Sequence, residues 1–275
     1  AYAPPTHAEQ VATQLYAYAA MCPYNLSRWE CYWCVREPRV PPATVVGYVQ
    51  NLKRARDVFG YVAVVNSTNS VWVAFRGSHN VPNVGEDLDF VPVRDADAPS
   101  DAWVHRGFYE DYISVRTQVH TAVTKALAAL KPTPPKLLMV TGHSLGAALA
   151  RHASTDLQPL ARAANAEVLV TTFGEPRVGN APFAAWAQSR VARSARVTWI
   201  RDPVPHLPPA ALGFHHPAHE LFYEQNTTRF AVCDGSGEDA ACSDRWDVYD
   251  PLDHVHYLGA YVSDAFGQPN CVQFE

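Results

Sequence analysis

The chain has 275 residues, of which 48% are hydrophobic and 18% are charged, so it can bury a sizeable core and is not of disordered composition. Its net charge of -5 gives no sign of the basic surface that nucleic-acid binding needs. No window approaches 18 continuous apolar residues, which argues against a transmembrane helix. Length and composition predict one domain over residues 1–275 that works without nucleic acid.

The six cysteines are an even number and indicate an oxidising, extracellular compartment. Six cysteines allow fifteen pairings. Local spacing suggests the disulfides Cys31–Cys34, Cys233–Cys242 and Cys22–Cys271. A zinc site or a redox Cys-x-x-C motif is the alternative, but only one Cys-x-x-C is present and the other spacings do not suit zinc. Glycosylation sequons fit a secreted glycoprotein and stand at Asn25, Asn66 and Asn226.

The first half of the chain predicts two helices and a hairpin. Apolar residues recur at helical spacing over 8–20, and the cysteine- and proline-rich stretch 22–42 is typical of a loop. The β-rich runs 61–65 and 71–75 are joined by Asn-Ser-Thr-Asn-Ser, which predicts an antiparallel hairpin. A long apolar stripe over 108–130 predicts an amphipathic helix, and a Lys-Pro-Thr-Pro-Pro segment ends it.

The second half of the chain alternates between predicted strands and predicted helices. Strands are predicted at 136–140, 168–173 and 196–200, and helices at 147–153 and 182–191. The tail from Pro203 is rich in proline and histidine and is predicted to be mostly irregular as far as His254. This alternation predicts an α/β hydrolase architecture, with a mostly parallel sheet, helices on both faces and an early antiparallel hairpin.

A Gly-x-Ser-x-Gly motif, centred on Ser144, stands between a predicted strand and a predicted helix. In this context the motif is typical of a nucleophile elbow. The serine adopts a strained backbone so that its hydroxyl leaves the sheet, and side chains at Gly142 and Gly146 would collide with the strand and the helix. The free N–H groups at the helix start favour developing negative charge at the same place. An ordinary glycine turn is the alternative interpretation.

A serine nucleophile needs a base, and the base needs an acid that fixes its tautomer. On this fold the order along the chain is serine, acid, histidine. Asp202 follows the strand 196–200 directly and is the first candidate for the acid, although Asp-Pro is also a common turn; Glu175 is the reserve candidate. The residues alone leave six histidines open as the base: His206, His215, His216, His219, His254 and His256.

Acyl transfer also needs two N–H donors that point at the oxyanion. The residue after the nucleophile, Leu145, supplies one in this fold, and a loop after an early strand supplies the other. Ser78, in Phe75-Arg76-Gly77-Ser78, has the required position after a strand. A plain glycine turn is the alternative for this loop.

Seven segments occur in one order across nearly the whole chain, from Cys22 to Cys271. They cover residues 75–78, 88–93, 104–108, 140–146, 176–179, 201–209 and 252–259. Each is weak alone, but together and in this order they resemble the secreted fungal class 3 lipase family, specifically the Rhizomucor-type triacylglycerol lipases, which are related to feruloyl esterases. The resemblance implies the α/β hydrolase fold and the same three disulfides.

Carried over position by position, the resemblance implies Ser144 as nucleophile, Asp202 as acid and His254 as base. His256 falls at a position that varies in the family. Ser78 and Leu145 match the oxyanion-hole positions.

Two further matches concern residues around the site. Asp87 matches a residue whose carboxylate holds the hydroxyl of the oxyanion serine. His215, His216 and His219 fall in a structural segment of the family, which argues against a metal cluster there.

The lid segment departs from the family pattern. Family members carry a short amphipathic lid with a central tryptophan, and the corresponding residues here are Asn80, Val81, Pro82, Asn83, Val84, Gly85 and Glu86. Valine replaces the tryptophan, and the proline and glycine disfavour a helix. We therefore expect weaker interfacial activation than in the family.

The sequence thus predicts a secreted, monomeric carboxylic ester hydrolase of the lipase type. It would act on acylglycerols at an oil–water interface through an acyl-enzyme, without metal or organic cofactor. Because related feruloyl esterases carry more polar lids, a feruloyl-type or short-chain carboxylesterase is the alternative. A non-catalytic lipid-binding relative and a serine peptidase are less favoured.

Overall fold

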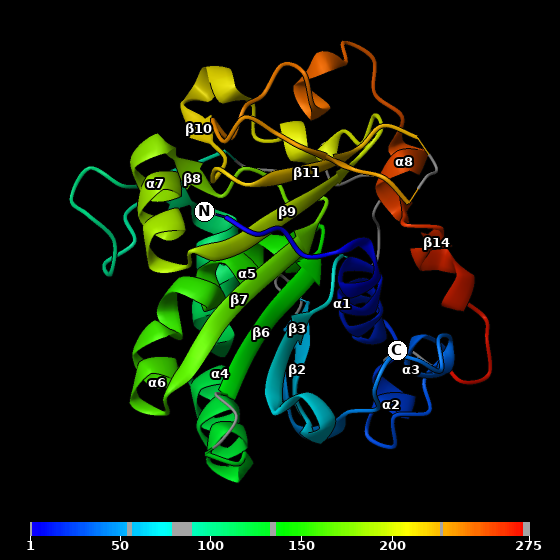
Figure 1. Ribbon diagram of the computed structural model, residues 1–275. Coiled ribbons are helices and arrows are strands. Elements are labelled where there is room, and N and C mark those ends of the chain that lie inside the picture. The colour runs from blue at the N-terminus through cyan, green and yellow to red at the C-terminus, as the bar shows by residue number, and fades with distance from the viewer. Residues whose placement is uncertain (1, 54–56, 79–89, 133–135, 226–227, 272–275) are drawn as a thin grey trace.

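The computed structural model describes residues 2–53, 57–78, 90–132, 136–225 and 228–271 (Figure 1). Its centre is an eight-stranded sheet of order β1-β2-β3-β6-β7-β9-β11-β12. The strands are β1 (Thr44–Asn51), β2 (Val58–Val65), β3 (Ser70–Phe75), β6 (Lys136–His143), β7 (Ala166–Phe173), β9 (Arg193–Trp199), β11 (Glu220–Tyr223) and β12 (Ala231–Val232). Within the described ranges, no helix is both long and apolar enough to cross a bilayer.

The sheet is parallel in its middle and antiparallel at both edges. Strands β3, β6, β7, β9 and β11 run parallel to one another, whereas β1, β2 and β3 form an antiparallel meander and β12 returns antiparallel to β11. The predicted hairpin is confirmed, since β2 pairs with β3 across a 3-10 turn in which Asn69 takes a left-handed φ of 49°. The carboxyl ends of β6, β7 and β9 therefore meet at one edge, where ligands bind in open α/β sheets.

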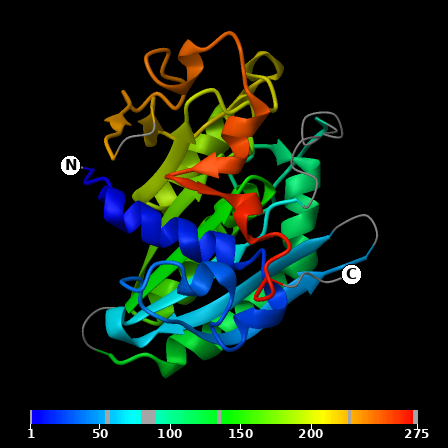
Figure 2. The same ribbon diagram turned by 90° about the vertical axis from the view of Figure 1, so that its right-hand side faces the viewer.

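Helices cover both faces of the sheet, as predicted (Figures 1 and 2). They are α1 (His7–Ala19), α2 (Pro23–Leu26), α3 (Tyr32–Val35), α4 (Arg106–Ala129), α5 (Leu145–Asp156), α6 (Gln158–Ala163), α7 (Ala181–Arg190) and α8 (Pro251–Val255). The alternation along β6 separates two cores: Leu138 and Val140 pack with α4 and α5, whereas Met139 packs on the α1 side with Trp72.

Several elements lie where the sequence predicted loop or irregular chain. A second sheet, of order β10-β8-β5-β4, is built from Phe214–His215, Gly179–Asn180, Val104–His105 and Pro92–Val93, and a small hairpin from β13 (His256–Tyr257) and β14 (Ala260–Tyr261). All of these strands have two residues, too few for a periodicity to be recognised. Strand β1 and helices α2, α3 and α6 were not predicted either.

The prediction of an irregular tail is wrong at β11. This four-residue strand pairs in parallel with β9 and begins with a buried glutamate, Glu220. The carboxylate accepts hydrogen bonds from Thr198 Oγ1 at 2.6 Å and from Arg196 Nη2 at 3.5 Å. A charged residue that is buried because it has partners hides the apolar pattern of the strand.

The structure contains the three disulfides expected from the sequence, Cys22–Cys271, Cys31–Cys34 and Cys233–Cys242. The first joins residues that are 249 positions apart. It ties the end of α1 to the C-terminal segment, drawn in red beside α1 in Figure 2. A cross-link over so long a loop restricts the unfolded chain strongly.

Candidate active site

The nucleophile turn has the strained geometry that the motif predicted. Ser144 lies between β6 and α5 with φ 59° and ψ -129°, a backbone conformation that residues other than glycine rarely adopt. A Cβ on Gly142 would lie 2.1 Å from the carbonyl oxygen of Gly146, and a Cβ on Gly146 would lie 2.3 Å from that of Phe75. Both glycines are therefore required, because the turn presses the start of the helix against the neighbouring strand.

The structure brings three of the predicted site residues together at the carboxyl edge of the sheet. His254 Nε2 lies 2.8 Å from Ser144 Oγ, and His254 Nδ1 lies 2.9 Å from Asp202 Oδ2. The three residues are almost fully buried, at 0% exposure for Ser144, 1% for His254 and 2% for Asp202. With Nδ1–H donating to the carboxylate, Nε2 is left to accept the proton of the serine hydroxyl.

The carboxylate of Asp202 is held in its charged form by its surroundings. Burial raises the pKa of Asp202, but the charge and hydrogen bond of His254 and the hydrogen bonds from the Tyr257 hydroxyl and the Val204 N–H outweigh it, so the pKa is lowered. The Val204 N–H donates to Oδ1 at 2.8 Å, and the tyrosine donates to Oδ2. A carboxylate with three donors stays ionised and fixed in orientation.

Helix α8 is anchored to the loop that carries the acid. Asp250 caps the helix by accepting from the Leu252 N–H at 3.0 Å, and its own N–H donates to the carbonyl of Arg201 at 2.9 Å. Asp253 accepts from the Arg201 N–H at 3.1 Å. These bonds join residues that come shortly before Asp202 and His254, and so fix the two segments relative to each other.

Two residues close to this group were not singled out as functional by the sequence. His143 donates from Nε2 to the carbonyl oxygen of His254 at 2.7 Å, and burial followed by the charge of His254 lowers its pKa to about 3. Gly174 has a φ of +55°, and a Cβ there would lie 2.9 Å from Asp202 Oδ2. The sequence could have pointed to both residues, because His143 is adjacent to Ser144 and Gly174 directly follows a predicted strand.

The loop after β3 lies against Ser144. A Cβ on Gly77 would be 3.0 Å from the carbonyl oxygen of His143 and 3.3 Å from Ser144 Cβ, and Ser78 is the next residue. Leu145 is the first residue of α5, so its N–H belongs to the open end of the helix. Asp87 and the lid residues 80–86 lie outside the residues that the structure describes.

The second candidate for the acid, Glu175, pairs with an arginine and not with His254. Glu175 is fully buried and forms a two-pronged ion pair with Arg151, with Nε–Oε1 and Nη2–Oε2 distances of 2.9 Å, and it accepts from Thr172. This pair joins α5 to the end of β7. Glu175 therefore does not orient His254.

The other five candidate histidines contact groups away from Ser144. His206 meets Asp244 at 3.1 Å, His216 Nε2 meets the carbonyl of Pro205 at 2.7 Å, and His219 Nδ1 meets that of Ser194 at 3.1 Å. His215 contacts the His216 carbonyl at 2.8 Å, and His256 stacks on Tyr261. In the described part of the chain, the only cluster of potential metal ligands contains Cys233 and Cys242, which form a disulfide.

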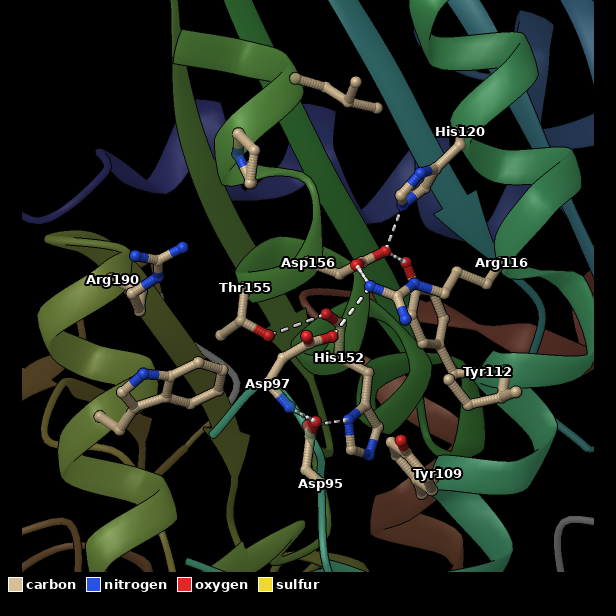
Figure 3. A pocket seen from close by; sticks show the side chains of 14 residues that line it. Asp95, Asp97, Tyr109, Tyr112, Arg116, His120, His152, Thr155, Asp156 and Arg190 are labelled. Carbon is tan, nitrogen blue, oxygen red and sulfur yellow. Dashed lines mark hydrogen bonds and ion pairs between the residues drawn. The ribbon is translucent and has the colours of Figure 1, made fainter. Parts of the chain in front are cut away.

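A charged cavity of about 270 Å³ lies between α4, α5 and α7, and none of the predicted site residues lines it (Figure 3). Asp156 occupies its centre and accepts hydrogen bonds from Tyr112 and Arg116, and it pairs with His120 Nε2 at 2.5 Å. Arg116 also reaches Asp97 at 2.9 Å. These bonds tie α5 to α4. The Nε atom of Arg190, which also lines the cavity, is buried and has no hydrogen-bond partner among the described residues.

The sequence model of the family Lipase (class 3) matches residues 72–212. The chain is 35% identical over 206 residues to a lipase of Rhizomucor miehei, covering 74% of this chain and 56% of that relative. It is 31% identical over 261 residues to secreted mono- and diacylglycerol lipase 1 of Fusarium solani, covering 91% of this chain and 75% of the relative. The chain thus spans little more than half the length of the Rhizomucor lipase.

Solved structures give the same result. Lipase II from Rhizopus niveus superposes with a TM-score of 0.84 at 29% identity, covering 94% of this chain and 97% of that one. A triacylglycerol lipase whose catalytic centre is described as a serine protease triad superposes with a TM-score of 0.83 at 29% identity, covering 94% and 96%. Sequence and structure together show that the chain belongs to the class 3 lipase family.

Proposed function

We propose that the protein is a secreted carboxylic ester hydrolase that acts on acylglycerols through Ser144, His254 and Asp202. The observation that carries the proposal is the continuous line of hydrogen bonds from Ser144 Oγ through the imidazole to the carboxylate, at 2.8 Å and 2.9 Å. A hydroxyl, a base and an orienting acid in this geometry are the elements of nucleophilic acyl transfer. The names of the relatives, lipase and mono- and diacylglycerol lipase, support glycerides as substrates.

In this mechanism the ester carbonyl is attacked by Ser144 Oγ while His254 Nε2 takes the hydroxyl proton. The protonated imidazole, held by Asp202, then gives that proton to the oxygen of the leaving glyceride, which leaves an acyl-enzyme. Water repeats the two steps and releases the fatty acid. His254 is neutral again at the end of each cycle, and Asp202 keeps its charge throughout.

The N–H groups of Ser78 and Leu145 are proposed to bind the oxyanion. Leu145 lies at the open end of α5, where helix N–H groups and the helix dipole favour negative charge. The contact of Gly77 with the nucleophile turn brings the Ser78 loop to the same place. Asp87 is proposed to hold the Ser78 hydroxyl, as the family resemblance implies.

The rate of tributyrin hydrolysis by Ser144→Ala tests this function. We expect the rate to fall by roughly 10⁴-fold or more, since removal of a triad nucleophile costs that much in other enzymes. Ser189→Ala is the matched control, because Ser189 is exposed and its hydroxyl donates to the Trp186 carbonyl within the same helix. If both variants hydrolyse the ester like the wild type, the proposal is wrong and a non-catalytic relative is favoured.

The same assay, taken through the solubility limit of tributyrin, separates the substrate classes. A rate that saturates smoothly below the limit fits the weak lid of residues 80–86 and an esterase or partial-glyceride lipase. A jump at the limit indicates interfacial activation. Methyl ferulate as a second substrate tests the feruloyl-esterase alternative.

We further propose that residues 1–275 form one domain that is exported as a monomer. Three disulfides support an oxidising compartment, and the relative from Fusarium solani is named as secreted. Sedimentation velocity of the purified chain tests the monomer. Mass spectrometry of the chain from a eukaryotic secretory host tests glycosylation at Asn25, Asn66 and Asn226.

A further inference from the structure

An apolar groove of about 410 Å³ lies on the α1 face of the sheet, away from the triad. Its walls come from the N-terminal segment 2–5, from α1 and from β3, β6, β7 and β9. Figure 1 shows the N-terminal segment crossing in front of β9 and β7 before it enters α1, while the lower part of β7 carries no helix on this side. A mostly apolar hollow of this size is typical of a small-molecule site.

The floor of the groove is a row of four side chains on four neighbouring strands. Trp72 on β3 pairs in register with Met139 on β6, Met139 with Leu169 on β7, and Leu169 with Arg193 on β9. Residues paired in this way point to the same face of a sheet. With about 4.8 Å between strands, the row runs roughly 14 Å from the indole to the base of the arginine. It is an apolar track that ends in a cation.

The cationic end of the row is half exposed and takes part in one surface ion pair. The side chain of Arg193 is 52% exposed and pairs with Glu167 at 3.3 Å, whose side chain is 51% exposed. An exposed pair of this kind contributes little and exchanges readily. Nearby, the buried hydroxyl of Tyr2 has no hydrogen-bond partner in the described structure. Burial raises the pKa of Tyr2 to about 12 against the opposing charge of Arg193, so it is a neutral donor beside the guanidinium.

The polar atoms of Trp72 and Ser70 at the opposite end have hydrogen-bond partners. Trp72 Nε1 donates to Ser70 Oγ at 3.0 Å, and the indole stacks on Tyr16 with ring centroids 4.0 Å apart. Ser70 Oγ is also 2.7 Å from Thr68 Oγ1. Between the two ends, Met139 and Leu169 are only partly buried, so apolar surface remains that a ligand could cover.

We propose that this groove binds one long-chain carboxylate, a free fatty acid, with its alkyl chain over Leu169 and Met139 and its carboxylate at Arg193. The apolar track matches an alkyl chain, and the guanidinium matches a carboxylate. The source of the ligand rests on the proposed function, because fatty acids are the product of that hydrolysis. Met139 lies roughly 17 Å before Ser144 along the strand, so the groove is a second site and not the acyl pocket of the triad.

Calorimetric titration of dodecanoate, below its micelle concentration, into Ser144→Ala tests the proposal. We expect saturable binding whose Kd rises by about tenfold or more when Arg193→Glu is added, because attraction is replaced by repulsion. Lys125→Glu is the matched control, since it makes the same charge change at an exposed position of α4, on the other face of the sheet, and should leave Kd unchanged. Leu169→Trp, which fills the groove, should abolish this binding while the folded circular dichroism spectrum is kept.

The proposal is overturned if Ser144→Ala does not bind dodecanoate. It is also overturned if Ser144→Ala alone and its combinations with Arg193→Glu, Lys125→Glu and Leu169→Trp all bind dodecanoate with equal affinity. Sedimentation velocity tests whether a second copy of the chain occupies the groove instead. A dimer that dissociates in the Leu169→Trp variant would show that the groove is a dimer interface and would overturn the fatty-acid site. The two proposals can fail independently. If the wild-type chain has no esterase activity, the proposed function is wrong, but the titration with dodecanoate still shows whether Arg193→Glu weakens binding.

Discussion

The imidazole of His143 stacks on that of His254, with ring centroids 4.6 Å apart and an angle of 28° between the planes. The same His143 ring donates from Nε2 to the backbone carbonyl of His254 at 2.7 Å. Since its pKa is lowered to about 3, chiefly by burial, His143 is neutral at pH values well above 3. A neutral ring thus packs on the side chain of His254 and binds its backbone carbonyl without placing a positive charge beside it.

The first prediction concerns this support. His143→Leu removes the hydrogen bond and the stacked ring, and we expect kcat on tributyrin to fall by about tenfold, the effect of roughly 1.4 kcal/mol from one buried hydrogen bond. His256→Gln is the control, because His256 is half-buried and stacks on Tyr261. An unchanged kcat in His143→Leu would show that His254 is positioned by Asp202 alone.

The second prediction concerns the acid. Asp202→Asn keeps the size of the side chain but favours the wrong tautomer of His254, and we expect kcat to fall by roughly 10⁴-fold with the fold retained. Initial rates on tributyrin and a circular dichroism spectrum measure the two quantities. A loss of less than about tenfold would contradict the role of Asp202 and reopen the search for the acid.

The third prediction separates Glu175 from that role. Glu175→Gln leaves the buried guanidinium of Arg151 without its counter-charge, so we expect the free energy of unfolding to fall by about 3–5 kcal/mol. The kcat of the folded fraction should stay within about twofold of the wild type, because Glu175 does not contact His254. Urea unfolding and initial rates test both parts, and the opposite pattern, lost rate at normal stability, would make Glu175 the acid.

The fourth prediction concerns stability in acid. Burial lowers the pKa of His152 to about 3, below the ordinary histidine value of 6.5. Between these two pH values the unfolded chain binds a proton that the folded chain does not, so this group makes the free energy of unfolding decrease as pH falls from 6.5 towards 3. Replacing His152 by glutamine removes this contribution, up to about 1.4 kcal/mol per pH unit.

Urea unfolding of His152→Gln and the wild type at pH 7, 6, 5 and 4 measures this slope. We expect the variant to lose less stability per pH unit than the wild type, whatever its stability at pH 7. Parallel curves for the two proteins would mean that the protonation of His152 is not linked to folding.

Local patterns predicted much of the framework. The glycines around Ser144 predicted a strained turn because a side chain at either position has no room, and the φ of 59° bears this out. The hairpin followed from two β-rich runs joined by Asn-Ser-Thr-Asn-Ser. The long helix α4 followed from a periodicity of 3.6 residues, which depends only on which side of the helix is buried. The short strands were not predicted, because two residues are too few to show a periodicity. Strand β11 was missed because it begins with a charged residue, Glu220, which is buried and hydrogen-bonded.

The sequence by itself determined the nucleophile motif, the alternation of strands and helices, and the cysteines that could pair by local spacing. The residues alone left six histidines and two acids open as partners of Ser144, and family resemblance favoured His254 and Asp202. Only the tertiary structure brings these side chains within hydrogen-bond distance across separations of 110 and 52 residues, and sends Glu175 to Arg151 instead. The same holds for the row from Trp72 to Arg193, because the strands that carry it become neighbours only when the sheet assembles.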